Sequence, residues 1–390
     1  MNTNFIYHAP TKVYFGENKL SNLGFEIRQF GNKVLLVYGE GSIKKIGLYD
    51  KVLNELNNAG MTIFELAGVE PNPNYTSLND GAAICKKENV DVILAVGGGS
   101  TIDASKGIAS ATFYDGDAWD LCNGTAKTDK FLPIVAVLTL VATGSEMDGG
   151  AVISNKATHE KKGLGADGLK PKVAFLDPTV TYSVNKFQTA CGSVDIMSHL
   201  FDTAYFAFDN DMELLNSFME AQLRTIIKYA PIAQKEPDNY DARANLMWAS
   251  SLALNGLMQG GKQVAPCCHW MEHELSAYYD ITHGLGLAII TPRWMKYVLN
   301  EKTAPKFYRF GVNVFGIDPS LDEMTVAEKS IEMLSDFFFK TLGLQSTLEE
   351  LGIDEQHFDV MAESACFGDV LNGIVPLNKE DIIKIYKMCL

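Results

Sequence analysis

Two pairs of residues, one of an aspartate and a histidine and one of two histidines, have helical spacing in the second half of this 390-residue chain. Asp195 and His199 stand four residues apart, and His269 and His273 repeat that spacing, so each pair would share one face of a helix. His283 follows in the segment DITHGLG. Imidazole and carboxylate ligands suit a divalent transition metal such as Fe²⁺ or Zn²⁺. The pattern indicates a metal site, although a lone helical histidine is more often an ordinary hydrogen-bonded residue.

The segment from His269 to His273 also matches H-x-x-E-H, a zinc motif of certain proteases. In that interpretation both histidines bind zinc and Glu272 is the base for peptide hydrolysis. The protease interpretation leaves the pair of Asp195 and His199 unexplained, together with the glycine-rich turns of the first half. It is therefore a remote alternative.

Two glycine-rich segments in the first half follow short apolar runs. The stronger is LAVGGGSTIDASK (94–106). Its glycines, Gly97, Gly98 and Gly99, would let backbone N–H groups approach a phosphate at the positive end of the next helix. Ser100 could cap that helix or donate to a phosphate oxygen. The second segment is VLLVYGEGSIKK (34–45), where Lys44 occupies the place of a third glycine, so neither segment has the G-x-G-x-x-G fingerprint.

A third strand end, LTLVATGSE (138–146), concentrates the hydroxyls of Thr139, Thr143 and Ser145. These hydroxyls could bind the ribose or amide groups of a nucleotide, or cap a following turn. Glycine turns also join strands to helices in many α/β proteins without touching phosphate. Three polar strand ends in one sheet nevertheless favour a dinucleotide site, because ligands bind at the carboxyl ends of parallel strands.

The elements that would position these residues differ between the two halves. Short, β-branched apolar runs at 34–38, 62–66, 92–96 and 134–138 alternate with helical stretches such as 49–59 and 75–88. This rhythm predicts a Rossmann-like parallel sheet with helices on both faces. From about residue 185 the chain becomes rich in Leu, Ala and Met, with long amphipathic segments such as 242–258. We therefore expect an α/β dinucleotide-binding domain over 1–184 and an all-helical metal-binding domain over 185–390.

Composition restricts the class of protein. Hydrophobic residues make up 47% of the chain and charged residues 21%, which suffices for more than one core. The net charge of -15 argues against nucleic acid and against anionic membrane surfaces. No apolar run is long enough to span a membrane, and the first residues lack the layout of a secretory signal. The seven cysteines are scattered and odd in number, which suits a reducing cytoplasm.

Longer segments of the chain resemble the iron-containing (group III) alcohol dehydrogenases, particularly the bacterial NAD(P)H-dependent butanol dehydrogenases and the related aldehyde reductases. The resemblance rests on PTKVYFG, AVGGGSTID, LTLVATGSEMD and above all CHWMEHELSAYYDITHGLGLAIITP. It implies a metal-dependent, NAD(P)(H)-linked oxidoreductase that interconverts small primary alcohols and aldehydes of the butanol type. The metal would act as a Lewis acid while hydride passes to or from nicotinamide C4.

The same resemblance implies roles for individual residues. The metal ligands would be Asp195, His199, His269 and His283, with His273 a catalytic residue beside the nicotinamide. The cofactor contacts would be Gly39, Glu40, Ser42, Gly97, Gly98, Gly99, Ser100, Asp103, Thr139, Ser145 and Lys161. Members of the family are commonly dimers joined through their N-terminal strands, so a homodimer through residues 4–15 is expected.

Glu40 departs from the pattern of this family, in which relatives often read Tyr-Gly-Gly-Gly-Ser where this chain reads YGEGS. A carboxylate there would accept a hydrogen bond from the adenosine ribose and repel the 2′-phosphate of NADP. Ser42, Lys44 and Lys45 could instead hold a phosphate. We therefore predict NAD(H), with NADP(H) as the alternative.

Two other functions remain open at this point. A polyol or sugar-phosphate dehydrogenase or synthase of a related fold would also bind NAD and metal, but such sites need basic residues near the metal. The chain has none close to 269–283 before Arg293. A non-catalytic redox or metal-storage protein is the second alternative, and turnover of butyraldehyde with NAD(P)H would distinguish it from the enzyme.

Overall fold

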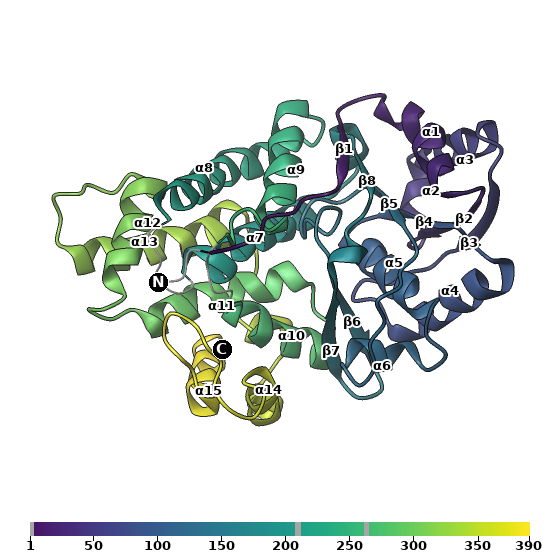
Figure 1. Cartoon of the computed structure of the whole chain (residues 1–390). Helices are drawn as coiled ribbons and strands as arrows, with labels where there is room; N and C mark the ends of the chain where they lie inside the picture. Colours follow the sequence, from purple (N-terminus) through teal and green to yellow (C-terminus); the bar gives the residue numbers. More distant parts are fainter. Residues whose placement is uncertain (1–3, 207–211, 261–264) are drawn as a thin grey trace. The chain divides into compact units, whose positions relative to one another are not determined.

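The computed structural model describes residues 4–206, 212–260 and 265–390 (Figure 1). It contains two compact units, His8–Val184 and a second that combines Met1–Tyr7 with Asn185–Leu390. The dinucleotide-binding and metal-binding domains expected over 1–184 and 185–390 remain a prediction, and the two units are described separately.

A six-stranded parallel sheet forms the centre of the α/β unit, in the order β1-β8-β5-β4-β2-β3. Its strands are β1 (Lys12–Phe15), β2 (Lys33–Tyr38), β3 (Thr62–Leu66), β4 (Val92–Gly97), β5 (Ile134–Leu138) and β8 (Val173–Leu176). The longer helices of the unit are α3 (Leu48–Asn58), α4 (Tyr75–Glu88) and α5 (Gly99–Ala111). The predicted fold class and all four predicted strands are confirmed.

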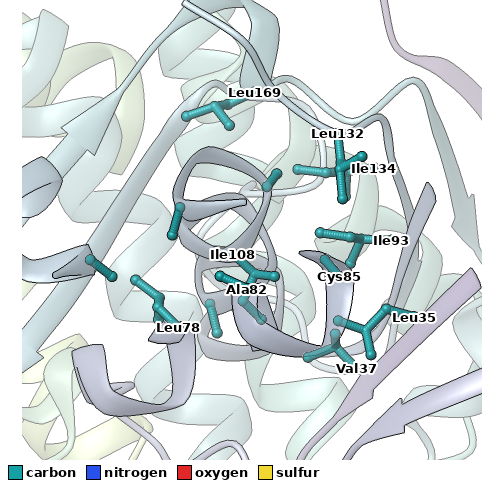
Figure 2. Close-up of a cluster of buried hydrophobic side chains, with 14 of the residues drawn as sticks. Leu35, Val37, Leu78, Ala82, Cys85, Ile93, Ile108, Leu132, Ile134 and Leu169 are labelled. Atoms are coloured by element: carbon teal, nitrogen blue, oxygen red, sulfur yellow. The ribbon is translucent and has the colours of Figure 1, made fainter. Parts of the chain in front are cut away.

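The inner strands β2, β4, β5 and β8 are buried on both faces of the sheet, which explains their continuous apolar runs. Along β2, Leu35 and Val37 pack on one face with α4 and α5, as Figure 2 shows for the residues it labels. Val34, Leu36 and Tyr38 pack on the other face with α1 (Leu23–Ile27) and α3. Successive residues of a strand point to opposite faces, so one short run serves two cores.

Shorter elements complete this unit. They are the helices α2 (Ser42–Lys45) and α6 (Ala118–Cys122), the 3₁₀ turns η1 (Lys19–Asn22), η2 (Arg28–Phe30), η3 (Asp167–Leu169) and η4 (Pro178–Thr181), and the strands β6 (Gly150–Asn155) and β7 (Glu160–Gly165). The last two form an antiparallel hairpin that follows β5 along the chain.

Only part of the expected dimer segment, residues 4–15, forms a strand. Pairing with β8 begins at Lys12. The N–H groups of Lys12 and Gly16 donate to carbonyls of Lys172 and Leu176. Pro10 stands where the next donor of this ladder would be needed and has no N–H. The strand therefore does not extend before Lys12, and the homodimer through residues 4–15 stays a prediction.

The regular elements of the second unit are all helices in its described residues, apart from one isolated bridge between Leu371 and Leu377. Its α-helices are α7 (Lys186–Leu200), α8 (Glu213–Lys235), α9 (Tyr240–Leu254), α10 (Cys267–Tyr279), α11 (His283–Val298), α12 (Ala304–Phe315), α13 (Glu323–Asp336), α14 (Phe358–Ala365) and α15 (Lys379–Met388). Two π-helical turns, η5 (Phe201–Tyr205) and η6 (Phe337–Thr341), extend α7 and α13. The 3₁₀ turns η7 (Glu349–Leu351) and η8 (Glu355–His357) precede α14.

The helix predicted over 242–258 is present with shifted bounds. Asn239 caps α9 by accepting a hydrogen bond from the N–H of Ala242, so the helix begins at Tyr240. It ends at Leu254, shortly before Gly256, which has a φ of 90°. Among the described residues, no helix combines the length and the apolar character needed to cross a membrane.

Candidate metal centre and dinucleotide loops

Three helices of the second unit bring together the four predicted metal ligands. Asp195 and His199 lie one turn apart on α7, His269 lies in the first turn of α10, and His283 is the first residue of α11. The Oδ1 atom of Asp195 lies 3.7 Å from Nδ1 of His199, 3.7 Å from Nε2 of His269 and 3.6 Å from Nε2 of His283. The four side chains therefore converge on one point.

Two glycines of the HGLG segment allow this close approach. A Cβ atom at Gly284 would lie 2.1 Å from the carbonyl oxygen of Cys191 on α7. A Cβ atom at Gly286 would lie 2.7 Å from Cγ of Glu272 on α10. Because α11 can contact both neighbours at glycines, His283 reaches the residues of α7 and α10.

The converging atoms fit a divalent transition metal. Asp195 Oδ1, His199 Nδ1 and His269 Nε2 are buried and lack a hydrogen-bond partner in the structure. Buried polar atoms normally have such a partner. Ligand bonds of about 2.1 Å in a tetrahedral site place neighbouring ligand atoms about 3.4 Å apart, close to the separations around Asp195. One carboxylate and three imidazoles suit Fe²⁺ and Zn²⁺ alike.

The electrostatics of the cluster are dominated by burial and by opposite charges. Burial lowers the pKa of His199 to about 4. Burial also opposes ionisation of Asp195, but the flanking imidazoles outweigh it and lower the pKa of this carboxyl well below its usual range. For His269, the carboxylates of Asp202 and Asp195 outweigh burial and raise the pKa to about 10. The pocket thus holds a carboxylate in its charged, metal-binding form.

His273 lies beside the cluster. Its ring centroid is 5.6 Å from that of His283 and 6.4 Å from that of His269. Ligand atoms of Glu272, His273 and His283 also lie within 4.8 Å of one another. Glu272, however, accepts a hydrogen bond from Ser276 and contacts Nδ1 of His283, and its side chain is fully buried. His273 is therefore adjacent to the predicted ligands, and its catalytic role remains a prediction.

The same contacts contradict the protease interpretation of H-x-x-E-H. A general base must reach water and substrate, whereas Glu272 is enclosed by Ser276 and His283. In the protease interpretation, His269 and His273 would bind the same ion. Nε2 of His269 instead lies 3.7 Å from Oδ1 of Asp195.

The sequence did not reveal that two buried carboxylates, Asp202 and Glu272, contact histidines of this cluster. Asp202 lies 3.0 Å from Nδ1 of His269, and Glu272 contacts Nδ1 of His283. Asp202 could have been found, because it follows Asp195 by seven residues and His199 by three, which places all three on one helical face.

The glycine loop of the α/β unit has the predicted strand-to-helix geometry. Gly97 ends β4, Gly98 is the N-cap of α5 and Gly99 is its first residue, with no side-chain cap on the helix. Ser100 lies inside the first turn, so the interpretation of Ser100 as the cap is wrong. A Cβ atom at Gly97 would lie 2.3 Å from Thr101, and one at Gly99 would lie 2.5 Å from Thr143. At Gly98 the added atom would have more room, because its nearest neighbour, on Leu140, would be 3.1 Å away.

Two further predicted cofactor contacts, Asp103 and Ser145, form a buried network with Lys106 and Asp148. Ser145 Oγ donates to Asp103 at 2.6 Å and accepts from the ammonium of Lys106 at 2.7 Å. Lys106 also contacts Asp148 at 2.9 Å and the carbonyl of Gly150 at 2.6 Å. Burial raises the pKa of Asp103 to about 6. Sequence reasoning missed Lys106, because nothing local to it indicates that its charge is buried.

The remaining predicted cofactor residues lie on other parts of the α/β unit. Thr139 follows β5 and is partly exposed, and Lys161 is buried on β7. Gly39, Glu40 and Ser42 lie between the end of β2 and the start of α2, with Glu40 and Ser42 exposed. The ammonium of Lys44 lies over the rings of Tyr38 and Tyr49, at 5.1 and 4.5 Å from their centroids.

Comparisons with known proteins agree with this picture. The family model "Iron-containing alcohol dehydrogenase" matches residues 10–178, and the model of the C-terminal part of the same family matches residues 189–390. NADH-dependent butanol dehydrogenase A of Clostridium acetobutylicum is 50% identical over 385 residues, 98% of each chain. NADPH-dependent aldehyde reductase YqhD of Escherichia coli is 37% identical over 90% of each chain.

A solved structure is also similar to this chain. The crystal structure of NADH-dependent butanol dehydrogenase A from Thermotoga maritima superimposes with a TM-score of 0.94 at 40% identity, covering 99% of this chain and 98% of that one. The chain belongs to the iron-containing alcohol dehydrogenase family. The predicted family and the predicted activity, that of an NAD(P)-linked alcohol dehydrogenase, are thus confirmed at the level of the family.

Proposed function

We propose that this alcohol dehydrogenase interconverts small primary alcohols and aldehydes of the butanol and butyraldehyde type with NAD(H), at a divalent metal held by Asp195, His199, His269 and His283. The observation that carries the proposal is the convergence of three imidazole nitrogens, from His199, His269 and His283, around Oδ1 of Asp195. The names of the butanol dehydrogenases similar to this chain support the substrate class.

The residues of the chain would divide the work as follows. When bound, the divalent ion supplies Lewis acidity toward the substrate oxygen. The N–H groups of the loop at Gly97, Gly98 and Gly99 bind the pyrophosphate at the N-terminus of α5. His273, next to the ligand histidines, holds or transfers the proton that accompanies hydride transfer.

Glu40 supports the choice of NAD(H). Its exposed carboxylate follows β2, where the acidic residue of a dinucleotide fold accepts a hydrogen bond from the ribose. At about 4 Å from a 2′-phosphate it would cost roughly 4 kcal/mol at an effective dielectric near 20, or about 1 kcal/mol in bulk water. Lys44 opposes this preference only weakly, because its ammonium lies against the rings of Tyr38 and Tyr49.

The sugar-phosphate alternative receives no support from the described residues. Arg293, the first basic residue after the ligand segment, directs its guanidinium to the carbonyls of Ser346 and Ile289. It also lies over the ring of Phe339.

A homodimer through the N-terminal residues remains part of the proposal, supported by the exposed side chains of Phe5, Ile6 and Tyr7.

Metal removal and reconstitution test the proposed function. The metal-free protein should regain NADH-dependent reduction of butyraldehyde on addition of Fe²⁺ or Zn²⁺. His199→Ala and His283→Ala should lose most of the metal and nearly all turnover while still binding NADH. His159→Asn is the control, because this exposed histidine lies in the turn between β6 and β7, outside the cluster, and asparagine tolerates its positive φ. Full metal occupancy and unchanged rates in both cluster variants would refute the assignment.

A further inference from the structure

Asp202 is held in place by the π-helical turn that extends α7. It is buried with 1% exposure, and Phe206 N–H donates to the carbonyl of Phe201 to close the turn. The Asp202 oxygens lie 3.0 and 3.1 Å from Nδ1 of His269. Oδ2 also accepts the backbone N–H of His269 at 3.1 Å. One carboxylate therefore contacts this histidine at both its ring and its backbone.

The backbone contact supplies a missing helix cap. Helix α10 begins after Pro266, which offers no side-chain cap. His269 is the third residue of α10, and its N–H is one of the amides that an N-cap side chain would normally bind. Because Asp202 accepts from this N–H, its carboxylate is fixed relative to the imidazole it contacts.

Glu272 stands in the same relation to His283. Its carboxylate contacts Nδ1 of His283, and its other oxygen accepts a hydrogen bond from Ser276. The Glu272 side chain is fully buried and faces Gly286, so it has little freedom to move away. Two of the three predicted histidine ligands thus have a buried carboxylate on Nδ1 and Asp195 on Nε2.

We propose that Asp202 and Glu272 are positioning residues that fix the tautomer of His269 and His283. This inference rests on the proposed metal site. A carboxylate only accepts hydrogen bonds, so Nδ1 of each imidazole carries a proton, and Nε2 is the nitrogen that would bind the metal. Asp202 adds a second constraint, because it holds the first turn of α10 in the position from which His269 reaches Asp195.

The test replaces each carboxylate by its amide, in Asp202→Asn and Glu272→Gln. The amide nitrogen can donate to Nδ1 and so favour a proton on Nε2, the metal-facing atom. Glu220→Gln is the matched control, because Glu220 is also buried, with 4% exposure, but binds Tyr205 and Arg309 instead of a histidine. The measurement is the Zn²⁺ dissociation constant of each folded, metal-free protein by competition with a chromophoric chelator.

We expect the dissociation constant to rise about 10- to 100-fold in Asp202→Asn and in Glu272→Gln, and to stay near the parent value in Glu220→Gln. Thermal unfolding of the metal-free proteins separates positioning from capping. If Asp202→Asn and Glu272→Gln only lower the unfolding temperature and keep the parent affinity for Zn²⁺, the inference is wrong. An equal loss of affinity in Glu220→Gln would also overturn it.

A failure of the proposed function would be recognised separately. In that case the parent protein itself would bind no Zn²⁺ or Fe²⁺ with the stoichiometry of one ion per chain, and the inference would fall with the site. A parent that binds one ion and loses it in His199→Ala, with unchanged affinity in both amide variants, would refute the inference alone.

Discussion

Substitution of Lys106 tests what stabilises the structure next to Gly97–Gly99, the loop proposed to bind the dinucleotide. Its ammonium is fully buried on α5 and donates to Ser145, Asp148 and the carbonyl of Gly150. Lys106→Met keeps an unbranched side chain of similar length but removes the charge and its hydrogen bonds. The variant leaves the carboxylate of Asp148 without its cation, and Asp103 without a neighbouring positive charge.

The expected loss follows from the burial of this pair. Removing one partner of a buried ion pair costs about 3–5 kcal/mol, against a total stability of roughly 5–15 kcal/mol for a typical protein. With a urea slope of about 2 kcal/mol per molar, the unfolding midpoint should fall by roughly 2 M. Lys106→Met should also weaken NADH binding, because Ser145 and Asp103 lose the group that positions them.

Urea denaturation of the parent, Lys106→Met, Asp148→Asn and the double variant measures this loss as a double-mutant cycle. Because the two side chains are in direct contact, the double variant should be more stable than the sum of the single losses predicts. A loss below about 1 kcal/mol in Lys106→Met, the range typical of exposed ion pairs, would refute the reasoning. Additive losses would show that Lys106 and Asp148 do not stabilise one another.

The same variant should show a defined dependence on pH. Burial raises the pKa of Asp103 to about 6, above its usual value, and Lys106 opposes this rise. A carboxyl whose pKa is raised on folding favours the folded state less as pH rises through that pKa. Without Lys106 the charged form becomes still less favourable, so the loss of stability in Lys106→Met should be larger at pH 8 than at pH 5. A loss independent of pH would contradict the placement of Asp103 in this network.

Three further predictions concern the candidate sites. Gly98→Ala should raise the NADH dissociation constant at least tenfold, about 1.4 kcal/mol, with little effect on unfolding. Gly99→Ala should chiefly destabilise the fold, because its Cβ would lie 2.5 Å from Thr143. Fluorescence titration measures the loss of NADH affinity and calorimetry the loss of stability in each variant. Unchanged NADH affinity in Gly98→Ala would count against the pyrophosphate site. His273→Ala should retain the metal with lower kcat and an altered pH–rate profile, so metal analysis showing an empty site would make this residue a ligand. Glu40→Gly should shift the ratio of kcat/KM for NADH and NADPH toward NADPH by about tenfold or more, whereas a parent that already prefers NADPH would disprove the role of Glu40.

Local sequence was sufficient for the parallel sheet. Strands buried on both faces need uninterrupted apolar residues, and the predicted bounds of 134–138 agree with β5. The predicted bounds of 62–66 agree with β3, a partly exposed strand at the edge of the sheet. The predicted helix over 75–88 likewise agrees with α4, which Asn74 caps. The strand β1 was not predicted with bounds of its own, and its start at Lys12 follows from Pro10, which lacks the N–H that pairing requires.

The candidate metal ligands were partly accessible from sequence because helical spacing is a local property. Asp195 and His199 share a helix face whatever surrounds them. That His269 and His283 join them, and that His273 lies to one side, depends on how α10 and α11 pack against α7. The tight contacts at Gly284 and Gly286 decide this packing, and no spacing rule encodes them.

By itself the sequence determined three features: the order of an α/β half followed by a helical half, the glycine turn after β4, and the residue types able to hold a divalent ion. Each of these features depends only on residues close together in the sequence, within one or two helical turns or a single strand. Only the tertiary structure decided which nitrogen of each imidazole faces Asp195 and which carboxylate lies behind it. It alone buried Lys106 against Asp148, 42 residues away. Such pairings depend on contacts between distant segments, and a residue's type and spacing do not specify the partner it meets after the chain has folded.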